Sequence, residues 1–343
     1  MSEFDRIIRV GLVGAGGIVK QRHLPGFEAL PNVRITAVAN STLDSAQRFC
    51  DEHAPDAEAI ARWEDVVDNE NVDVVWIGAT PHLHADPTCF ALQRGKHVFC
   101  QARMAAEMPE ATRMWEASLA NPELVTGLCP APHGMKHGEM VKKLLSEGAI
   151  GTPHSLVLHA SCPAWLDAAA PAHWRQRVEI SGAQILTLGI YVEVVQRWLG
   201  HIAEVKASGN VVIPERQGYM VETPDFVHVL GRFQNDVEAV MMFSGVAAHA
   251  PTPCCWIFGT EGTIRYDFDT DEVQLGRVKG PFENVTVPYE FVREWTVEED
   301  FFRAVMDPAA PRPKPDFMEG LCYMRVVDAV WTSIAEGRAV ACV

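Results

Sequence analysis

The first 128 residues alternate short apolar runs with amphipathic stretches. The apolar runs are rich in β-branched residues and predict five strands, at Ile7–Val13, Val33–Ala39, Val72–Ala79, His97–Cys100 and Leu124–Leu128. The stretches between them predict four helices, from Ile18 to about Leu30, from a cap at Ser41 or Thr42 to about His53, over His84–Arg94 and over Pro109–Leu119. This alternation predicts an α/β domain whose parallel sheet is covered by helices on both faces.

The rest of the chain has a different pattern. Helices are predicted at Gly138–Glu147, Gln184–Leu199, Glu298–Met306 and Asp316–Ala335. Between about Ala203 and Thr296, strand-like stretches follow one another without helices, at Val205–Ala207, Phe226–Phe233, Val237–Phe243, Cys255–Phe258, Gly262–Phe268 and Val273–Leu275. Strands in series favour an antiparallel sheet. We therefore expect two domains, residues 1–126 and residues 127–343, the second an α+β domain with a large, mostly antiparallel open sheet.

Composition narrows the class of protein. The chain has 343 residues, of which 48% are hydrophobic and 22% charged, so it can bury a large core. Its net charge of −16 would repel nucleic acid and anionic membranes, which argues against either as a partner. No segment is long and apolar enough to span a membrane, and the first residues lack the basic start and apolar core of an export signal. We expect a cytoplasmic enzyme.

Cysteine and histidine spacings offer little support for a metal. Nine cysteines are scattered along the chain without a Cys-x-x-Cys pair, which predicts reduced thiols and no structural zinc. His133 and His137 are four residues apart, a spacing compatible with a metal on one helix face. No third ligand accompanies them, so we expect no metal.

A glycine-rich turn directly follows the first strand and opens a helix. Gly14 permits a tight turn, and Gly16 lets the backbone approach a pyrophosphate. The helix start at Gly17 and Ile18 offers free N–H groups and its positive dipole end to that anion. The turn predicts a dinucleotide site, although Val19 stands where a third glycine is usual. An ordinary turn in an α/β domain is the alternative.

The residue that hydrogen-bonds the adenosine ribose is expected after the second strand. Asn40 and Ser41 hold that place, where a carboxylate is usual. Asn40 can hydrogen-bond a ribose hydroxyl, as NAD requires. The absence of a carboxylate removes repulsion against the 2′-phosphate of NADP, but no arginine is adjacent to bind that phosphate. These residues leave NAD and NADP open, and helix capping is the alternative role of Ser41.

At these motifs the chain resembles the glucose-fructose oxidoreductase, inositol dehydrogenase and rhizopine-catabolism (Gfo/Idh/MocA) family. The resemblance spans nearly the whole chain and rests on the stretches Val10–Ile18, Ala79–His84, Gly95–Cys100, Ser181–Gly200, Gly259–Thr263 and Arg325–Val340. It implies a Rossmann dinucleotide-binding domain followed by a domain whose open sheet carries the substrate pocket and often the oligomer interface. It also implies a homodimer or homotetramer.

The chain departs from this family at its customary catalytic positions. The family's Glu-Lys-Pro motif reads Gln101–Arg103 here, and its Asp and His positions read Thr187 and Tyr191. From the resemblance and the chemistry of the side chains, we expect Arg103 to polarise a carbonyl or stabilise an oxyanion, Tyr191 to act as acid or base, and Thr187 to donate a hydrogen bond. A salt bridge from Arg103 to Glu107 and a core position for Tyr191 are the alternatives.

Other polar residues complete the expected site. Four follow parallel strands and are expected on the cofactor side: Thr80, Pro81, His84 and Gln101. His84 has the alternative role of holding its own loop by bonds to backbone. Five are expected in the substrate pocket: His133, His159, Trp174, Arg175 and Gln184. Arginine and tryptophan crowded together suit an anionic or polyhydroxylated ligand, and an exposed basic loop is the alternative.

Three functions are compatible with these residues. The first is an NAD(P)-dependent oxidoreductase that acts on a carbohydrate-like or sugar-acid substrate, with non-standard catalytic residues. The second is a redox-neutral lyase, hydratase or epimerase on the same fold, which the missing Lys, Asp and His motivate. The third is a non-catalytic sensor that binds dinucleotide. The preserved glycine turn and the polar pocket favour the first.

Overall fold

The computed structural model describes residues 6–130 and 135–342. The chain forms two compact units. The first consists of residues 1–130 together with 296–321, and the second of residues 131–295 together with 322–343. The expected division at residues 126 and 127 therefore needs a correction, because a segment near the C-terminus returns to the first unit.

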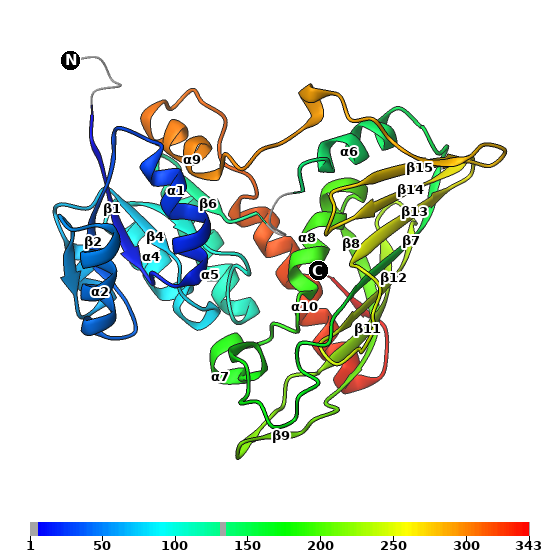
Figure 1. Ribbon diagram of the computed structural model, residues 1–343, viewed down its shortest axis with the longest axis horizontal. Helices are drawn as coiled ribbons and strands as arrows, with labels where there is room; N and C mark the ends of the chain where they lie inside the picture. Colours follow the sequence, from blue (N-terminus) through cyan, green and yellow to red (C-terminus); the bar gives the residue numbers. More distant parts are fainter. Residues whose placement is uncertain (1–5, 131–134, 343) are drawn as a thin grey trace. The chain divides into compact units, whose positions relative to one another are not determined.

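The first unit is built on a six-stranded parallel sheet with the strand order β3-β2-β1-β4-β5-β6 (Figure 1). The strands are β1 (Ile8–Val13), β2 (Val33–Ala39), β3 (Glu58–Ile60), β4 (Val74–Ile77), β5 (His97–Cys100) and β6 (Thr126–Leu128). This order is that of a doubly wound dinucleotide-binding sheet, as expected. β3 is absent from the predicted strands, because its three residues, one exposed and two half-buried, form no apolar run.

Helices of the first unit connect these strands. They are η2 (Val19–His23), α1 (Leu24–Glu28), α2 (Leu43–His53), α3 (Trp63–Asp68), η3 (Pro81–Leu83), α4 (Ala85–Gln93), α5 (Met108–Ala120) and α9 (Val297–Met306). The expected helix from Ile18 to Leu30 is interrupted, since η2 is a π-helical turn that leads into α1. Pro25 explains the interruption, because it has no N–H to donate to the preceding turn.

Helix α9 completes the core of the first unit. The Trp76 ring stacks on Phe99 with centroids 3.7 Å apart, and Phe301 and Phe302 of α9 lie within 6 Å of Trp76, at 5.5 and 5.9 Å. All four rings are almost fully buried. The burial of these large aromatic surfaces holds the returning segment against the sheet.

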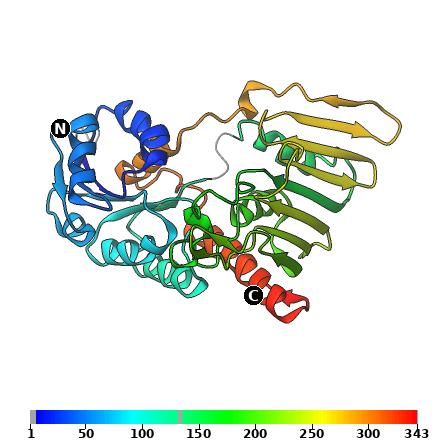
Figure 2. The same ribbon diagram turned by 60° about the horizontal axis from the view of Figure 1, so that its bottom comes forward.

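The second unit contains a nine-stranded sheet with the order β16-β15-β14-β13-β7-β12-β11-β8-β17. Figure 2 shows strands of this sheet side by side. Its strands are β7 (Pro153–Ser161), β8 (Ile202–Asn210), β11 (Phe226–Phe233), β12 (Glu238–Ser244), β13 (Cys254–Gly259), β14 (Gly262–Asp267), β15 (Val273–Arg277), β16 (Phe282–Asn284) and β17 (Val340–Ala341), and a separate pair is formed by β9 (Glu215–Arg216) and β10 (Tyr219–Met220). Only the β7–β12 pair of this sheet is parallel. The predicted mostly antiparallel open sheet is confirmed.

Helices cover one face of this sheet, as Figure 1 shows for α8 and α10. The helical elements of the second unit are α6 (Gly138–Ser146), η4 (Trp174–Gln176), α7 (Val178–Ser181), α8 (Leu188–Leu199) and η5 (Tyr289–Phe291). Helix α10 (Phe317–Glu336) begins in the first unit and continues into the second at Cys322. Strand residues that face the helices are apolar and buried, such as Leu158, Met241 and Ile257. None of the helices in the described part of the chain is long and apolar enough to cross a membrane.

Candidate functional site

The glycine turn after β1 has the geometry of an anion cradle. Gly14 has φ +84°, and a Cβ added there would lie 2.6 Å from the backbone nitrogen of Ala79, so the turn requires glycine. Gly16 and Gly17 are exposed, and a Cβ added at either would meet nothing within 4 Å. The N–H groups of the first helical turn, where Ile18 lies, have no partner within their own helix. The turn therefore leaves open space in front of free amides, where a diphosphate fits.

This cradle lies where the strand order of the sheet reverses. β1 pairs with β2 on one side and with β4 on the other, and both neighbours end at the same edge. The turn packs closely on β4, since a Cβ added at Gly78 would collide with Val19 and with the carbonyl of Gly14. Val19, which departs from the usual glycine, thus contacts the strand directly. The residues present fit a dinucleotide.

The end of β2 carries the residues expected at the ribose. Asn40 directly follows β2 and is half-buried, and Ser41 is exposed. The cap of α2 is Thr42, whose hydroxyl accepts a hydrogen bond from the Ser45 amide at 3.1 Å. Capping therefore occupies Thr42 and leaves Asn40 and Ser41 as the ribose candidates.

Three of the residues expected on the cofactor side follow β4 at the carboxyl end of the sheet. Thr80 is half-buried and precedes the turn η3, which Pro81 begins. His84 must be corrected, because it is fully buried and cannot reach a ligand. Its Nδ1 lies 2.9 Å from the carbonyl oxygen of Arg103, and its Nε2 lies 2.9 Å from that of Ala79. His84 therefore ties two loops together, which was its alternative role.

The turn after β5 carries Gln101 and Arg103. Gln101 is 6% exposed, and its side-chain amide contacts the buried imidazole of His23, so it faces the core, contrary to the expected cofactor contact. Arg103 is 5% exposed and has φ +60°. Helix α5 begins only at Met108, so the helical i, i+4 spacing proposed for an Arg103–Glu107 pair does not exist.

Tyr191 and Thr187 belong to helix α8 of the second unit. Thr187 is the N-cap residue, and Tyr191 is buried with its ring centroid 4.7 Å from that of Phe268. Burial, together with the nearby Asp269 and Cys162, raises the pKa of the Tyr191 phenol well above its usual range. Such a phenol keeps its proton at neutral pH, so it can donate a hydrogen bond but is a poor base.

Gln184 lies before α8, outside the helix in which it was expected. It is 1% exposed, and its amide nitrogen lies 3.0 Å from Sδ of Met324 on α10. A Cβ added at Gly189 would lie 3.2 Å from the Gln184 side-chain oxygen. Gln184 therefore packs between α8 and α10, which corrects its expected contact with substrate.

The register of the sheet separates His159 from Tyr191. His159 pairs with Met242 of β12 and shares with it the face that carries no helices. Tyr191 packs on the opposite face, 6.2 Å from Phe243 between ring centroids. Successive residues of a strand point to opposite sides, so a pocket that contains Tyr191 cannot also contain His159. The expected site, in which both residues line one pocket, therefore needs a correction.

Arg175 follows Trp174 in the short turn η4. Its guanidinium lies over the Trp174 ring, 4.3 Å from the centroid. The buried Nε has no hydrogen-bond partner, and burial lowers the pKa of the side chain. Neighbouring Gln176 is fully buried and donates to Asp225 at 3.1 Å, which anchors the turn. The turn thus presents a desolvated cation beside an aromatic ring.

The two histidines with metal-compatible spacing do not form a described metal site. His133 lies outside the described residues. His137 caps α6, and its Nδ1 lies 2.7 Å from the carbonyl oxygen of Asp271. Over residues 6–130 and 135–342, no group of three or more His, Cys, Asp or Glu side chains could hold a metal ion.

Comparison with known families agrees with both units. A model described as an oxidoreductase family with an NAD-binding Rossmann fold matches residues 8–127, and a model of the GFO/IDH/MocA C-terminal domain matches residues 139–265. The chain belongs to the Gfo/Idh/MocA family. The resemblance noted from the sequence is thereby confirmed.

Individual relatives of the family are distant. Levoglucosan dehydrogenase of Pseudarthrobacter phenanthrenivorans is 28% identical over 305 residues, which cover 78% of this chain and 76% of that protein. dTDP-3,4-didehydro-2,6-dideoxy-alpha-D-glucose 3-reductase of Actinomadura kijaniata is 27% identical over 225 residues, 62% of this chain and 66% of that protein. A solved levoglucosan dehydrogenase in complex with NADH and levoglucosan has a TM-score of 0.87 at 23% identity, covering 98% of this chain and 99% of that one. That likeness shows a shared fold.

Two buried polar residues of the first unit were not among the residues singled out from the sequence. His23 and Glu298 are 0% and 2% exposed, and they contact each other across 275 positions of the chain. His23 follows three exposed polar residues, Lys20 to Arg22, so no local pattern set it apart as buried. No local pattern indicated Glu298, which looks like an ordinary acidic residue in the first turn of α9.

Proposed function

We propose that this chain is a nicotinamide-dinucleotide-dependent oxidoreductase that acts on a carbohydrate-like substrate, with NAD(H) as the preferred cofactor over NADP(H). The observation that carries the proposal is the glycine turn, where Gly14 must be glycine for packing while Gly16 and Gly17 face open space. The family description names NAD, and relatives in the family are named as sugar dehydrogenases and reductases. When bound, the cofactor supplies or accepts a hydride at the substrate carbon.

Arg175 supports a substrate that carries negative charge. The Nε of Arg175 is buried and has no hydrogen-bond partner among the residues that the structure describes. A cation held out of water favours a ligand that returns a charge-assisted hydrogen bond. We propose that the substrate is a sugar acid or a sugar phosphate, whose anion binds Arg175 and whose ring packs on Trp174.

The proposed catalytic residues are Arg103, Tyr191 and Thr187. The phenol of Tyr191 stays protonated at neutral pH, because its pKa is raised by burial and by nearby acidic groups. It is suited to donate a proton toward a substrate carbonyl oxygen during reduction, and Thr187 to hydrogen-bond the substrate. Arg103, always charged, is suited to stabilise an oxyanion.

A substrate panel tests the function. The purified protein is incubated with NADH or NADPH, or with their oxidised forms, and with neutral sugars, sugar acids and keto-sugar acids. The absorbance of the reduced nicotinamide and the product mass are followed together. We expect net cofactor turnover with an acidic sugar, and Arg175→Gln should raise KM for that substrate roughly tenfold while changing KM for its neutral analogue little.

Other outcomes of the panel would replace the proposal. Loss of water from the substrate without net change in the cofactor would assign a lyase or hydratase. Dinucleotide binding without turnover of any substrate would favour a sensor. If Tyr191→Phe leaves the rate of carbonyl reduction unchanged, Tyr191 is not the proton donor, and its role is in the core.

The helix-free face of the nine-stranded sheet supports a homo-oligomer. Its exposed side chains include Leu230, Val240 and Met242, which are 55%, 41% and 38% exposed and adjoin one another in the register of β11 and β12. We propose that a second copy of the chain covers this face in a homodimer, because a two-fold axis lets one apolar patch cover itself. Light scattering during size exclusion should give a dimer mass, reduced to the monomer mass by Val240→Lys.

The nine cysteines are all free thiols. Free thiols persist in reducing compartments, and we propose that the protein acts in one, the cytoplasm.

A further inference from the structure

Three polar side chains form a continuous buried chain inside the first unit. Glu298, His23 and Gln101 are 2%, 0% and 6% exposed. Nδ1 of His23 contacts Oε1 of Glu298, and Nε2 of His23 contacts the amide nitrogen of Gln101. The chain therefore links helix α9, the π-helical turn η2 and the end of strand β5. Buried polar groups are costly unless they are paired, so a chain of this length requires matched partners.

The surroundings of the imidazole are shaped for it. The Trp76 and Phe99 rings meet His23 edge-on, with centroids 4.9 and 5.5 Å away. Gly26 lies against Glu298, and a Cβ added to it would collide with the carboxylate. The π-helical turn places His23 at this point, and such turns are frequent at functional sites. Packing therefore leaves the imidazole a single orientation.

The hydrogen bonds also define where the protons lie. The backbone amide of Ala102 donates to Oε1 of Gln101 at 3.3 Å, so the NH₂ group of Gln101 faces His23. That group can only donate, which makes Nε2 of His23 the acceptor. The imidazole proton then lies on Nδ1 and is donated to Glu298. A carboxylate thus selects the histidine tautomer, and the histidine orients the amide.

The series of contacts from Glu298 through His23 ends at Gln101, in the turn that carries Arg103. The Gln101 backbone amide donates to the carbonyl of Ile77 at 3.0 Å, which holds β5 against β4. His84 holds the other side of this turn through the carbonyl oxygen of Arg103. In a doubly wound sheet the strands beyond β4 form the second mononucleotide-binding half, away from the glycine turn and the adenosine. The turn therefore belongs to the nicotinamide side of the site.

We propose that Glu298 and His23 are positioning residues, which act through Gln101 to hold the Gln101–Arg103 turn in place on the nicotinamide side. The proposal rests on dinucleotide binding by the first unit, the proposed function of the glycine turn. The proposal gives the Gln101 side-chain amide a structural role, at the position where the family usually has a glutamate. A glutamate at this position would have no N–H for Nε2 of His23.

Nucleotide binding separates positioning from general destabilisation. NADH and ADP-ribose share the adenosine and the diphosphate, but only NADH carries the nicotinamide. We expect Glu298→Leu to weaken NADH binding about tenfold and to reduce the fluorescence enhancement of bound NADH, while ADP-ribose affinity changes less than about twofold. Glu298→Gln keeps an oxygen that accepts from Nδ1, and it should restore most of the NADH affinity.

The tautomer provides a test that needs no ligand. Nitrogen-15 NMR of histidine-labelled protein should show the His23 proton on Nδ1 in the wild type, and protons on both nitrogens in Gln101→Glu, because two carboxylates then face the ring. A proton on Nε2 in the wild type would overturn the proposal, as would equal losses of NADH and ADP-ribose affinity in Glu298→Leu. If the wild type binds neither nucleotide, the proposed function fails. The His23 tautomer then still decides whether Glu298, His23 and Gln101 are hydrogen-bonded as proposed.

Discussion

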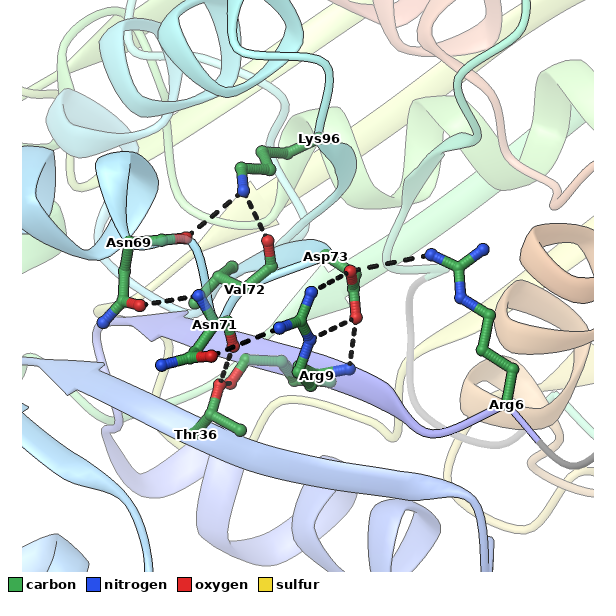
Figure 3. A network of polar contacts seen from close by, with 9 residues as sticks. Arg6, Arg9, Thr36, Asn69, Asn71, Val72, Asp73 and Lys96 are labelled. Carbon is green, nitrogen blue, oxygen red and sulfur yellow. Dashed lines mark hydrogen bonds and ion pairs between the residues drawn. The ribbon is translucent and has the colours of Figure 1, made fainter.

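The two ends of the six-stranded sheet treat their polar groups in opposite ways. At the amino end, charged side chains and backbone groups satisfy one another (Figure 3). The Arg9 guanidinium donates to both carboxylate oxygens of Asp73, at 2.9 and 2.8 Å, and the Arg9 amide also donates to Asp73. Lys96 donates to the carbonyl oxygens of Val72 and Asn69 at 2.5 and 3.2 Å. This end therefore has little left to offer a ligand.

At the carboxyl end, the glycine turn leaves backbone amides facing open space. A Cβ added at Gly16 or Gly17 would meet nothing within 4 Å. Charges paired within the fold stabilise it, whereas unpaired dipoles at a helix start are available to an anion. In this sheet the amino end contributes paired charges to stability, whereas the carboxyl end leaves backbone amides available for binding. The following substitutions test how far the two properties can be separated.

Gly14→Val should have the largest effect, because it damages both properties. The residue has φ +84°, and the added Cβ would lie 2.6 Å from the Ala79 nitrogen. We expect a loss of about 3 kcal/mol or more in the free energy of unfolding, and no measurable NADH binding. Urea denaturation and isothermal titration calorimetry measure the two. A variant as stable as the wild type would contradict the close packing of this turn on β4.

Gly16→Val should affect binding alone. Its side chain would enter the open space, so we expect the free energy of unfolding to change by less than about 0.5 kcal/mol and NADH affinity to fall at least about 100-fold. The same two measurements apply. Unchanged affinity would remove the diphosphate from the turn and with it the dinucleotide site.

Asp73→Asn should show the reverse pattern at the amino end. The substitution removes the charge that Arg9 and Arg6 approach, and we expect a loss of about 1–2 kcal/mol in stability with unchanged NADH affinity. The Glu64 side chain beside Arg62 is 35% exposed, against 13% for Asp73, so Glu64→Gln is the matched control and should cost almost nothing. Equal stability of the two variants would show that the Asp73 network contributes no more than a surface pair.

Acid should remove the same contribution gradually. Burial alone would raise the pKa of Asp73, but its hydrogen bonds and the charges of Arg9 and Arg6 outweigh burial and lower that pKa. A carboxylate whose pKa is lowered by folding stabilises the fold above the unfolded value, about 3.9, and loses this contribution as the pH falls further. The difference in melting temperature between wild type and Asp73→Asn should therefore be constant near neutral pH and shrink below about pH 4. A difference that grows in acid would reverse the assignment.

Local patterns in the sequence predicted most of the architecture. β-Branched runs, amphipathic spacing and the Gly14–Ile18 turn depend on neighbours within a few positions. The parallel sheet, the antiparallel sheet and the position of the glycine turn could therefore be predicted from the sequence. The amide donors of the turn could also be predicted from the sequence. They are backbone groups, and they are available because a helix begins there.

Side-chain surroundings were decided only by the tertiary structure. The face on which His159 lies depends on which side of its sheet the helices cover, and alternation along a strand cannot tell this. The inward direction of Gln101 and the partnership of His23 with Glu298 depend on α9 returning to the first unit across 275 positions. Contacts of this kind are set by the packing of the whole core, because a buried polar group takes its partner from whichever element folds against it.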